Sequence, residues 1–194
     1  DLNWSKFLRW FTPLAVICLI IIFPSGLYLM LFMVEPKDYV KAWVLPYGQM
    51  LLLKHISIIP VLAFAFINGV LTKKSMKILS FNPGPWIKGE SVILLFVFYF
   101  TAVMGTLSPP HDVEFTVKSE GASKWVEWLL GKDILTTLQS HLATSFQSVL
   151  LIILSIIYLF LILFSFHQKR LLPAVFFGIG FIAVLYFGLM LSLV

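Results

Sequence analysis

Residues 47–74, YGQMLLLKHISIIPVLAFAFINGVLTKK, form an apolar run that is long enough to cross a lipid bilayer as a helix. Two lysines close the run, whereas Lys54 and His55 lie inside it, near its beginning. An ionisable side chain within such a helix is costly to keep there, and it usually marks a functional site. We therefore take His55 as the first candidate functional residue.

The composition supports a membrane environment. The chain has 194 residues, of which 60% are hydrophobic and 12% are charged, and its mean hydropathy is +0.98. Soluble domains carry about 25% charged residues, so the chain is predicted to be an integral membrane protein surrounded by lipid. Its formal charge of +5 then indicates an excess of basic residues on the cytoplasmic side of the membrane, and we expect no nucleic-acid partner. The single cysteine, Cys18, excludes an internal disulfide framework and a cysteine-rich metal site.

Five apolar segments predict an all-α fold, a polytopic transmembrane bundle in a single membrane domain spanning residues 1–194. The segments are residues 11–34, 48–71, 91–107, 134–166 and 172–193. Residues 111–133 are predicted to form an extracytoplasmic loop, with an interfacial helix in the run SKWVEWLLGK. The chain starts at Asp1 without an initiator methionine, which is typical of a processed product or of part of a longer protein.

Charged residues divide between the two sides of this predicted bundle. The side of the N-terminus holds Lys6, Arg9, Lys73, Lys74, Lys77, Lys88, Lys169 and Arg170, against Asp1 and Glu90. The opposite side holds Lys37, Lys41, Lys54, Lys118, Lys124 and Lys132, against Glu35, Asp38, Asp112, Glu114, Glu120, Glu127 and Asp133. By the positive-inside rule, the N-terminus is predicted to be cytoplasmic and the C-terminus extracytoplasmic, in the plasma or inner membrane.

Imidazole and thioether groups gather in the predicted extracytoplasmic half. The candidate metal ligands there are His55, His111, His141, Met50 and Met104. This mixture suits copper, and thioethers favour Cu(I). A single methionine is more often packing than a ligand, so His55 carries most of the hypothesis. Glu90 is predicted to lie at a membrane interface, and no carboxylate is predicted in the middle of the membrane. We therefore expect no proton relay of paired acidic residues.

His141 belongs to a polar stripe that also contains Thr137, Thr144 and Ser148 at steps of three to four residues. In one continuous helix these residues would share a face directed into the bundle. His55 and His141 would then lie on parallel helices near the same side of the membrane. That arrangement also fits bis-histidine ligation of haem b, which stays open as the alternative cofactor.

Residues 10–110 resemble the copper resistance D (CopD) domain. Tyr47-Gly48, Leu51-Leu52-Leu53-Lys54 and Asn68 resemble its second helix, and Glu90 with Thr106-Leu107-Ser108-Pro109-Pro110 resembles its closing helix and proline end. Gly26 resembles its first segment more weakly. The resemblance implies a polytopic membrane protein associated with copper uptake or handling. It does not extend to residues 111–194.

The sequence thus favours a copper-handling membrane protein, which is not an enzyme and imports copper from the extracytoplasmic side. An extracytoplasmic copper-donor protein or domain and further membrane-complex partners are the expected partners. Two alternatives remain open, a b-type cytochrome with haem held by His55 and His141, and a membrane subunit that scaffolds a larger complex.

Overall fold

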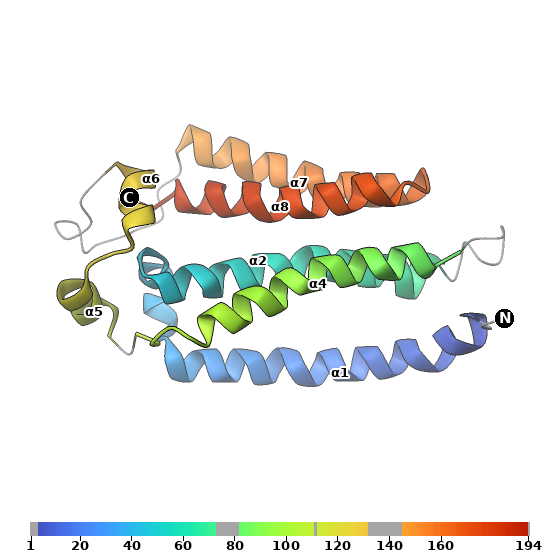
Figure 1. Ribbon diagram of the computed structural model, residues 1–194, viewed down its shortest axis with the longest axis horizontal. Helices are drawn as coiled ribbons and strands as arrows, with labels where there is room; N and C mark the ends of the chain where they lie inside the picture. Colours follow the sequence, from blue (N-terminus) through green and yellow to red (C-terminus); the bar gives the residue numbers. More distant parts are fainter. Residues whose placement is uncertain (1–3, 73–81, 111, 132–144, 194) are drawn as a thin grey trace.

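Five long apolar helices dominate the computed structural model, which describes residues 4–72, 82–110, 112–131 and 145–193 (Figure 1). They are α1 (Trp4–Met33), α2 (Pro46–Phe66), α4 (Gly84–Met104), α7 (Phe146–His167) and α8 (Leu171–Met190). Each of them is long and apolar enough to cross a membrane. The predicted all-α bundle with five transmembrane helices is therefore confirmed.

Shorter helices gather at one end of the bundle, which we call the cap end (Figure 1). They are η1 (Pro36–Asp38), η2 (Lys41–Val44), α5 (Val113–Glu120) and α6 (Lys124–Leu130). The opposite end, which we call the basic end, holds the beginning of α1, the beginning of α4 and the turn between α7 and α8 (Figure 1). The π-helical segment η3 (Ile67–Leu71) continues α2 toward this basic end.

Two helix pairs, α2 with α4 and α7 with α8, make up the packed part of the bundle (Figure 1). Glycines allow α8 to approach its neighbours closely. A Cβ on Gly180 would lie 2.9 Å from the ring of Tyr158 in α7, and one on Gly178 would lie 3.1 Å from Ile93 in α4. By contrast, the apolar window of α1 is not buried at all, so this helix leaves an apolar surface for lipid.

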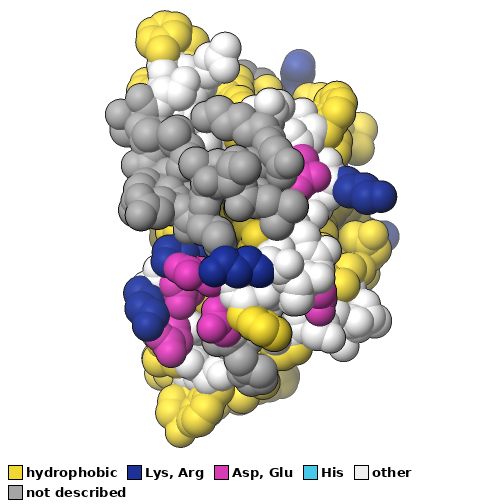
Figure 2. Space-filling view, turned by 90° about the vertical axis from the view of Figure 1, so that its left-hand side faces the viewer, with side chains coloured by type: hydrophobic (Ala, Val, Ile, Leu, Met, Phe, Trp, Pro, Cys, Tyr) yellow, Lys and Arg dark blue, Asp and Glu magenta, His cyan; other side chains and the backbone are white. Residues whose placement is uncertain are grey.

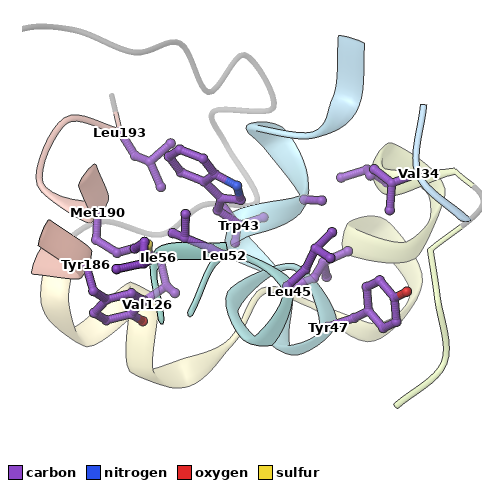
Figure 3. Close-up of a cluster of buried hydrophobic side chains, with 14 of the residues drawn as sticks. Val34, Trp43, Leu45, Tyr47, Leu52, Ile56, Val126, Tyr186, Met190 and Leu193 are labelled. Carbon is purple, nitrogen blue, oxygen red and sulfur yellow. The ribbon is translucent and has the colours of Figure 1, made fainter. Parts of the chain in front are cut away.

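Buried apolar side chains form one cluster at each end of the bundle. The outer cluster, at the cap end, joins η2, the first turns of α2, the short helices α5 and α6, and the end of α8 (Figure 3). Its buried members include Trp43, Leu52, Ile56, Val126 and Met190. The inner cluster consists of Phe64, Ile67, Trp86, Ile93, Ile162 and Ala174.

Two helix boundaries differ from the sequence prediction. Helix α4 begins at Gly84 rather than at residue 91, so Glu90 lies inside a membrane-spanning helix and not at its edge. Moreover, the prediction of a single helix over residues 134–166 is wrong at Ser145, because this residue has an extended backbone. Ser145 and Ser148 form a capping box that satisfies free N–H groups and begins α7 at Phe146. Of the predicted polar stripe, Ser148 lies in the first turn of α7, whereas Thr137, His141 and Thr144 lie outside the described residues.

Candidate metal site at the cap end

His55 lies in the third turn of α2, at the cap end, and its side chain is half-buried. Its Nδ1 is 2.8 Å from the hydroxyl oxygen of Tyr39, a hydrogen-bonding distance. Tyr39 follows η1 and precedes η2, so the bond ties the connection between α1 and α2 to the side of α2. This bond satisfies the ring nitrogen that would otherwise be unpaired within an apolar helix.

The hydrogen bond leaves the second ring nitrogen of His55 for other chemistry. When Nδ1 carries the proton it donates to the oxygen of Tyr39, and Nε2 then presents a lone pair. Histidines that bind metals are commonly oriented in this way by a partner on the other ring nitrogen. Burial raises the pKa of Tyr39 above its ordinary value. Tyr39 is therefore a neutral phenol at physiological pH.

Backbone packing fixes the position of Tyr39 relative to α2. The ring of Tyr39 meets Trp43 edge-on with centroids 5.6 Å apart, and Trp43 is buried in the outer cluster. Gly48, in the first turn of α2, lies directly under η2, because a Cβ there would overlap the carbonyl group of Ala42. The Tyr47-Gly48 pair thus has a structural reason, since only glycine permits this close approach.

Charged side chains surround this region on the surface of the cap end. Figure 2 shows acidic and basic groups side by side on that face. Lys41 lies 3.4 Å from Asp38 and 3.4 Å from Glu114, which links η1 and η2 to α5. Lys37 pairs with Glu35 at 2.7 Å. These charged groups lie at the same end of the bundle as His55.

The structure places the other candidate ligands unevenly. Met104 ends α4 and packs against the outer cluster, together with Met30, while Met190 is buried inside it. Met50 is half-buried in α2. His111 and His141 lie outside the described residues, so the site they would complete stays a prediction. No group of three or more His, Cys, Asp or Glu side chains that could hold a metal occurs in the residues described.

Sequence reasoning did not identify Tyr39 as the hydrogen-bond partner of His55. It lies 16 positions before His55 in a short irregular connection, where no helical periodicity relates the two residues. The aromatic and charged run EPKDYVKAW, residues 35–43, indicated only a loop between two apolar segments. A local sequence pattern cannot show which side chain of such a loop folds back onto the next helix.

The bundle, with five candidate spans and a histidine held at one end, defines a polytopic helical membrane protein. Residues 5–104 match the family model described as copper resistance protein D. Because the match covers more than half of the chain, the protein belongs to the CopD family, a family of membrane proteins associated with copper resistance and handling, typically transporters rather than enzymes. No curated protein and no solved structure matches the chain.

Proposed function

We propose that this protein takes up copper from the extracytoplasmic side of the membrane and that His55 binds the ion during entry. The observation that carries the proposal is the Tyr39–His55 hydrogen bond, which orients an imidazole at the cap end of a membrane-spanning helix. Membership of the CopD family supports copper as the transported substrate. The second ring nitrogen of His55 supplies the donor.

The remaining ligands would come from the same end. Met50 and Met104 offer thioethers there, and thioether with imidazole suits Cu(I). His111 would capture the ion outside, and His141 would join His55 in an inner station. Both of these roles rest on the sequence, because the structure does not describe either residue. A copper-donor protein or domain would deliver the ion to this face.

The charge distribution supports the proposed sidedness. In the described residues the basic end carries Lys6, Arg9, Lys88, Lys169 and Arg170 against Glu90 alone, whereas the cap end carries acidic and basic groups side by side (Figure 2). Positive residues flank membrane helices on the cytoplasmic side. The cap end, with His55, would then face outward. An outward position suits uptake, since His55 would then lie at the end of the bundle that an extracytoplasmic ion reaches first.

The direct test compares copper accumulation in cells that express the wild-type chain or His55→Ala. We expect accumulation in the variant to fall to that of cells without the protein. His167→Ala is the matched control, because His167 is exposed in the last turn of α7 at the basic end. Unchanged copper content in His55→Ala, at equal expression, would overturn the proposal.

A visible absorption spectrum of the purified protein tests the haem alternative on the same samples. A Soret band that disappears in His55→Ala would assign His55 to haem b instead of copper. Normal copper content together with normal assembly of both the His55 and the His141 variants would instead favour a scaffolding subunit.

A further inference from the structure

A second polar pair lies at the basic end, about 20 Å along α2 and η3 from His55 at 1.5 Å per residue. The side-chain amide of Asn68, in η3, donates to the Glu90 carboxylate in α4 at 2.6 Å. The same amide nitrogen also donates to the backbone carbonyl of Trp86 at 3.3 Å. Both acceptors lie on α4, so Asn68 fastens the π-helical segment to that helix.

These two bonds determine how the Asn68 amide is oriented. The carbonyl of Trp86 can only accept a hydrogen bond, so the amide nitrogen, and not the oxygen, must face it. The Asn68 oxygen consequently points away from this acceptor and has no hydrogen-bond partner among the residues described. Asn68 is only 8% exposed, so bulk water does not satisfy this oxygen.

A second buried oxygen without a partner follows one turn later. Thr72 is fully buried, at 0% exposure, and its hydroxyl makes no hydrogen bond within the described part of the chain. Thr72 comes four residues after Asn68, which puts both side chains on one face of the helical segment. Single-turn π-helical segments such as η3 often occur at functional sites.

Glu90 places a carboxyl group beside the same Asn68 amide. It is half-buried in the second turn of α4, within a membrane-spanning helix. The ion pairs found in the described residues all lie at the cap end, and none of them includes Glu90. An amide partner satisfies one carboxylate oxygen but cancels no charge. The ionised form of a carboxyl group in this environment is stabilised when a cation lies beside it.

We propose that Asn68, Thr72 and Glu90 bind a small, hard monovalent cation of the size of Na⁺ between η3 and α4. All three side chains offer oxygen, the ligand type that hard cations prefer and that Cu(I) does not. The cation supplies the positive charge that no described residue gives Glu90 and the partner that the two buried oxygens lack within the described part of the chain. The site is separate from His55 and does not depend on copper binding.

The test measures binding of ²²Na⁺ to the purified full chain in lipid nanodiscs, with choline replacing sodium at constant ionic strength. We expect saturable binding to the wild-type protein. Glu90→Gln should weaken it by about tenfold or more, because the charge is lost while an acceptor for Asn68 remains. Thr72→Val, which keeps the shape of the side chain, should weaken binding by a smaller factor.

Ser91→Ala is the matched control, because Ser91 neighbours Glu90 but is exposed and bonds to the carbonyl of Ile87 in its own helix. It should bind sodium like the wild type, and so should His55→Ala. Absence of saturable sodium binding by helical, folded wild-type protein would overturn the proposal. Equal binding by Glu90→Gln would do the same. Neither result would bear on copper accumulation through His55.

Discussion

The two ends of α2 and its continuation η3 each hold a polar side chain that reaches a neighbouring element. At the cap end, His55 contacts the phenol of Tyr39 on a connecting segment. At the basic end, Asn68 contacts the carboxylate of Glu90 on the next membrane-spanning helix. The imidazole and the phenol of the first pair can both be neutral. The second pair contains a carboxyl group whose charge, when it is ionised, no described residue balances.

This difference separates the chemistry of the two ends. A neutral imidazole in an apolar helix is satisfied by one hydrogen bond and keeps a nitrogen donor for a soft or borderline metal. A carboxylate with oxygen neighbours selects a hard cation. The proposed copper and sodium sites follow from these donor types, and each can be disturbed without removing a ligand of the other.

The two ends also differ in what limits their packing. At the cap end, Gly48 lies against the backbone of η2, which cannot move aside without displacing Tyr39. At the basic end, a Cβ on Gly89 would lie 2.6 Å from the terminal Cδ1 of Leu171, a flexible side-chain tip. The same substitution should therefore have different consequences at the two ends.

The largest expected effect is that of Gly48→Ala. It should lower the free energy of unfolding by about 1–3 kcal/mol, because the new methyl group must displace backbone. Gly89→Ala should cost less, since the tip of Leu171 can rotate. Gly26→Ala, where nothing lies within 4 Å, should be neutral or stabilise α1 by up to about 1 kcal/mol.

Unfolding in detergent, followed by far-UV circular dichroism, measures all three glycine variants. Gly48→Ala should also reduce copper binding while leaving sodium binding intact, because the disturbance is confined to the cap end. Equal destabilisation by Gly48→Ala and Gly26→Ala would contradict the close approach of η2 to α2.

A smaller effect is expected for Tyr39→Phe, which removes the hydroxyl and keeps the ring against Trp43. The variant should lose about 0.5–1.5 kcal/mol of stability, the usual net value of one hydrogen bond. If His55 binds copper, the affinity for Cu(I) should fall by about tenfold to a hundredfold, because the imidazole is no longer oriented. Competition with a Cu(I) chelator measures this affinity.

Tyr99→Phe is the control for Tyr39→Phe, since Tyr99 is exposed on α4 and its hydroxyl makes no hydrogen bond with the described residues. It should change neither stability nor copper affinity. Unchanged Cu(I) affinity in Tyr39→Phe, with His55→Ala impaired, would mean that His55 acts without orientation by Tyr39.

The number and type of the helices could be predicted from sequence, because bilayer-length apolar runs allow few other structures. The family was also predictable, and the position of His55 in α2 followed from the length of its run. Boundaries were less predictable. The beginning of α4 contains Pro85, Lys88 and Glu90, whose polarity lowers local hydropathy although the chain is already helical there.

Contacts between distant residues could not be predicted at all. Whether Asn68 reaches Glu90 depends on how α2 and η3 lie against α4, and the π-helical segment changes the direction in which Asn68 points. The carboxylate expected at an interface is consequently bonded inside the bundle. Ser145 was likewise read as part of a longer helix, because its capping role depends on the side chain of Ser148.

The smallest expected effect concerns pH and the ion pairs of Lys41 at the cap end. The hydrogen bond with Asp38 is the largest cause that raises the pKa of Lys41 above its ordinary value of 10.5, and Glu114 adds to it. A raised pKa means that the folded state holds this proton more tightly than the unfolded state does. The stabilisation is therefore complete below pH 10.5 and is lost as the pH rises through the higher folded-state value.

Thermal unfolding at pH 8 and at pH 11 tests this contribution. Wild-type protein should lose more stability over that interval than Lys41→Gln does, and high salt should shrink the difference, because the pair is partly exposed. Lys37→Gln is the matched control. The pKa of Lys37 is also raised, chiefly by its hydrogen bond to Glu35, but that partner is two residues away and links no separate element. If Lys37→Gln and Lys41→Gln respond alike, the bridge from η2 to α5 does not help to hold the cap end together.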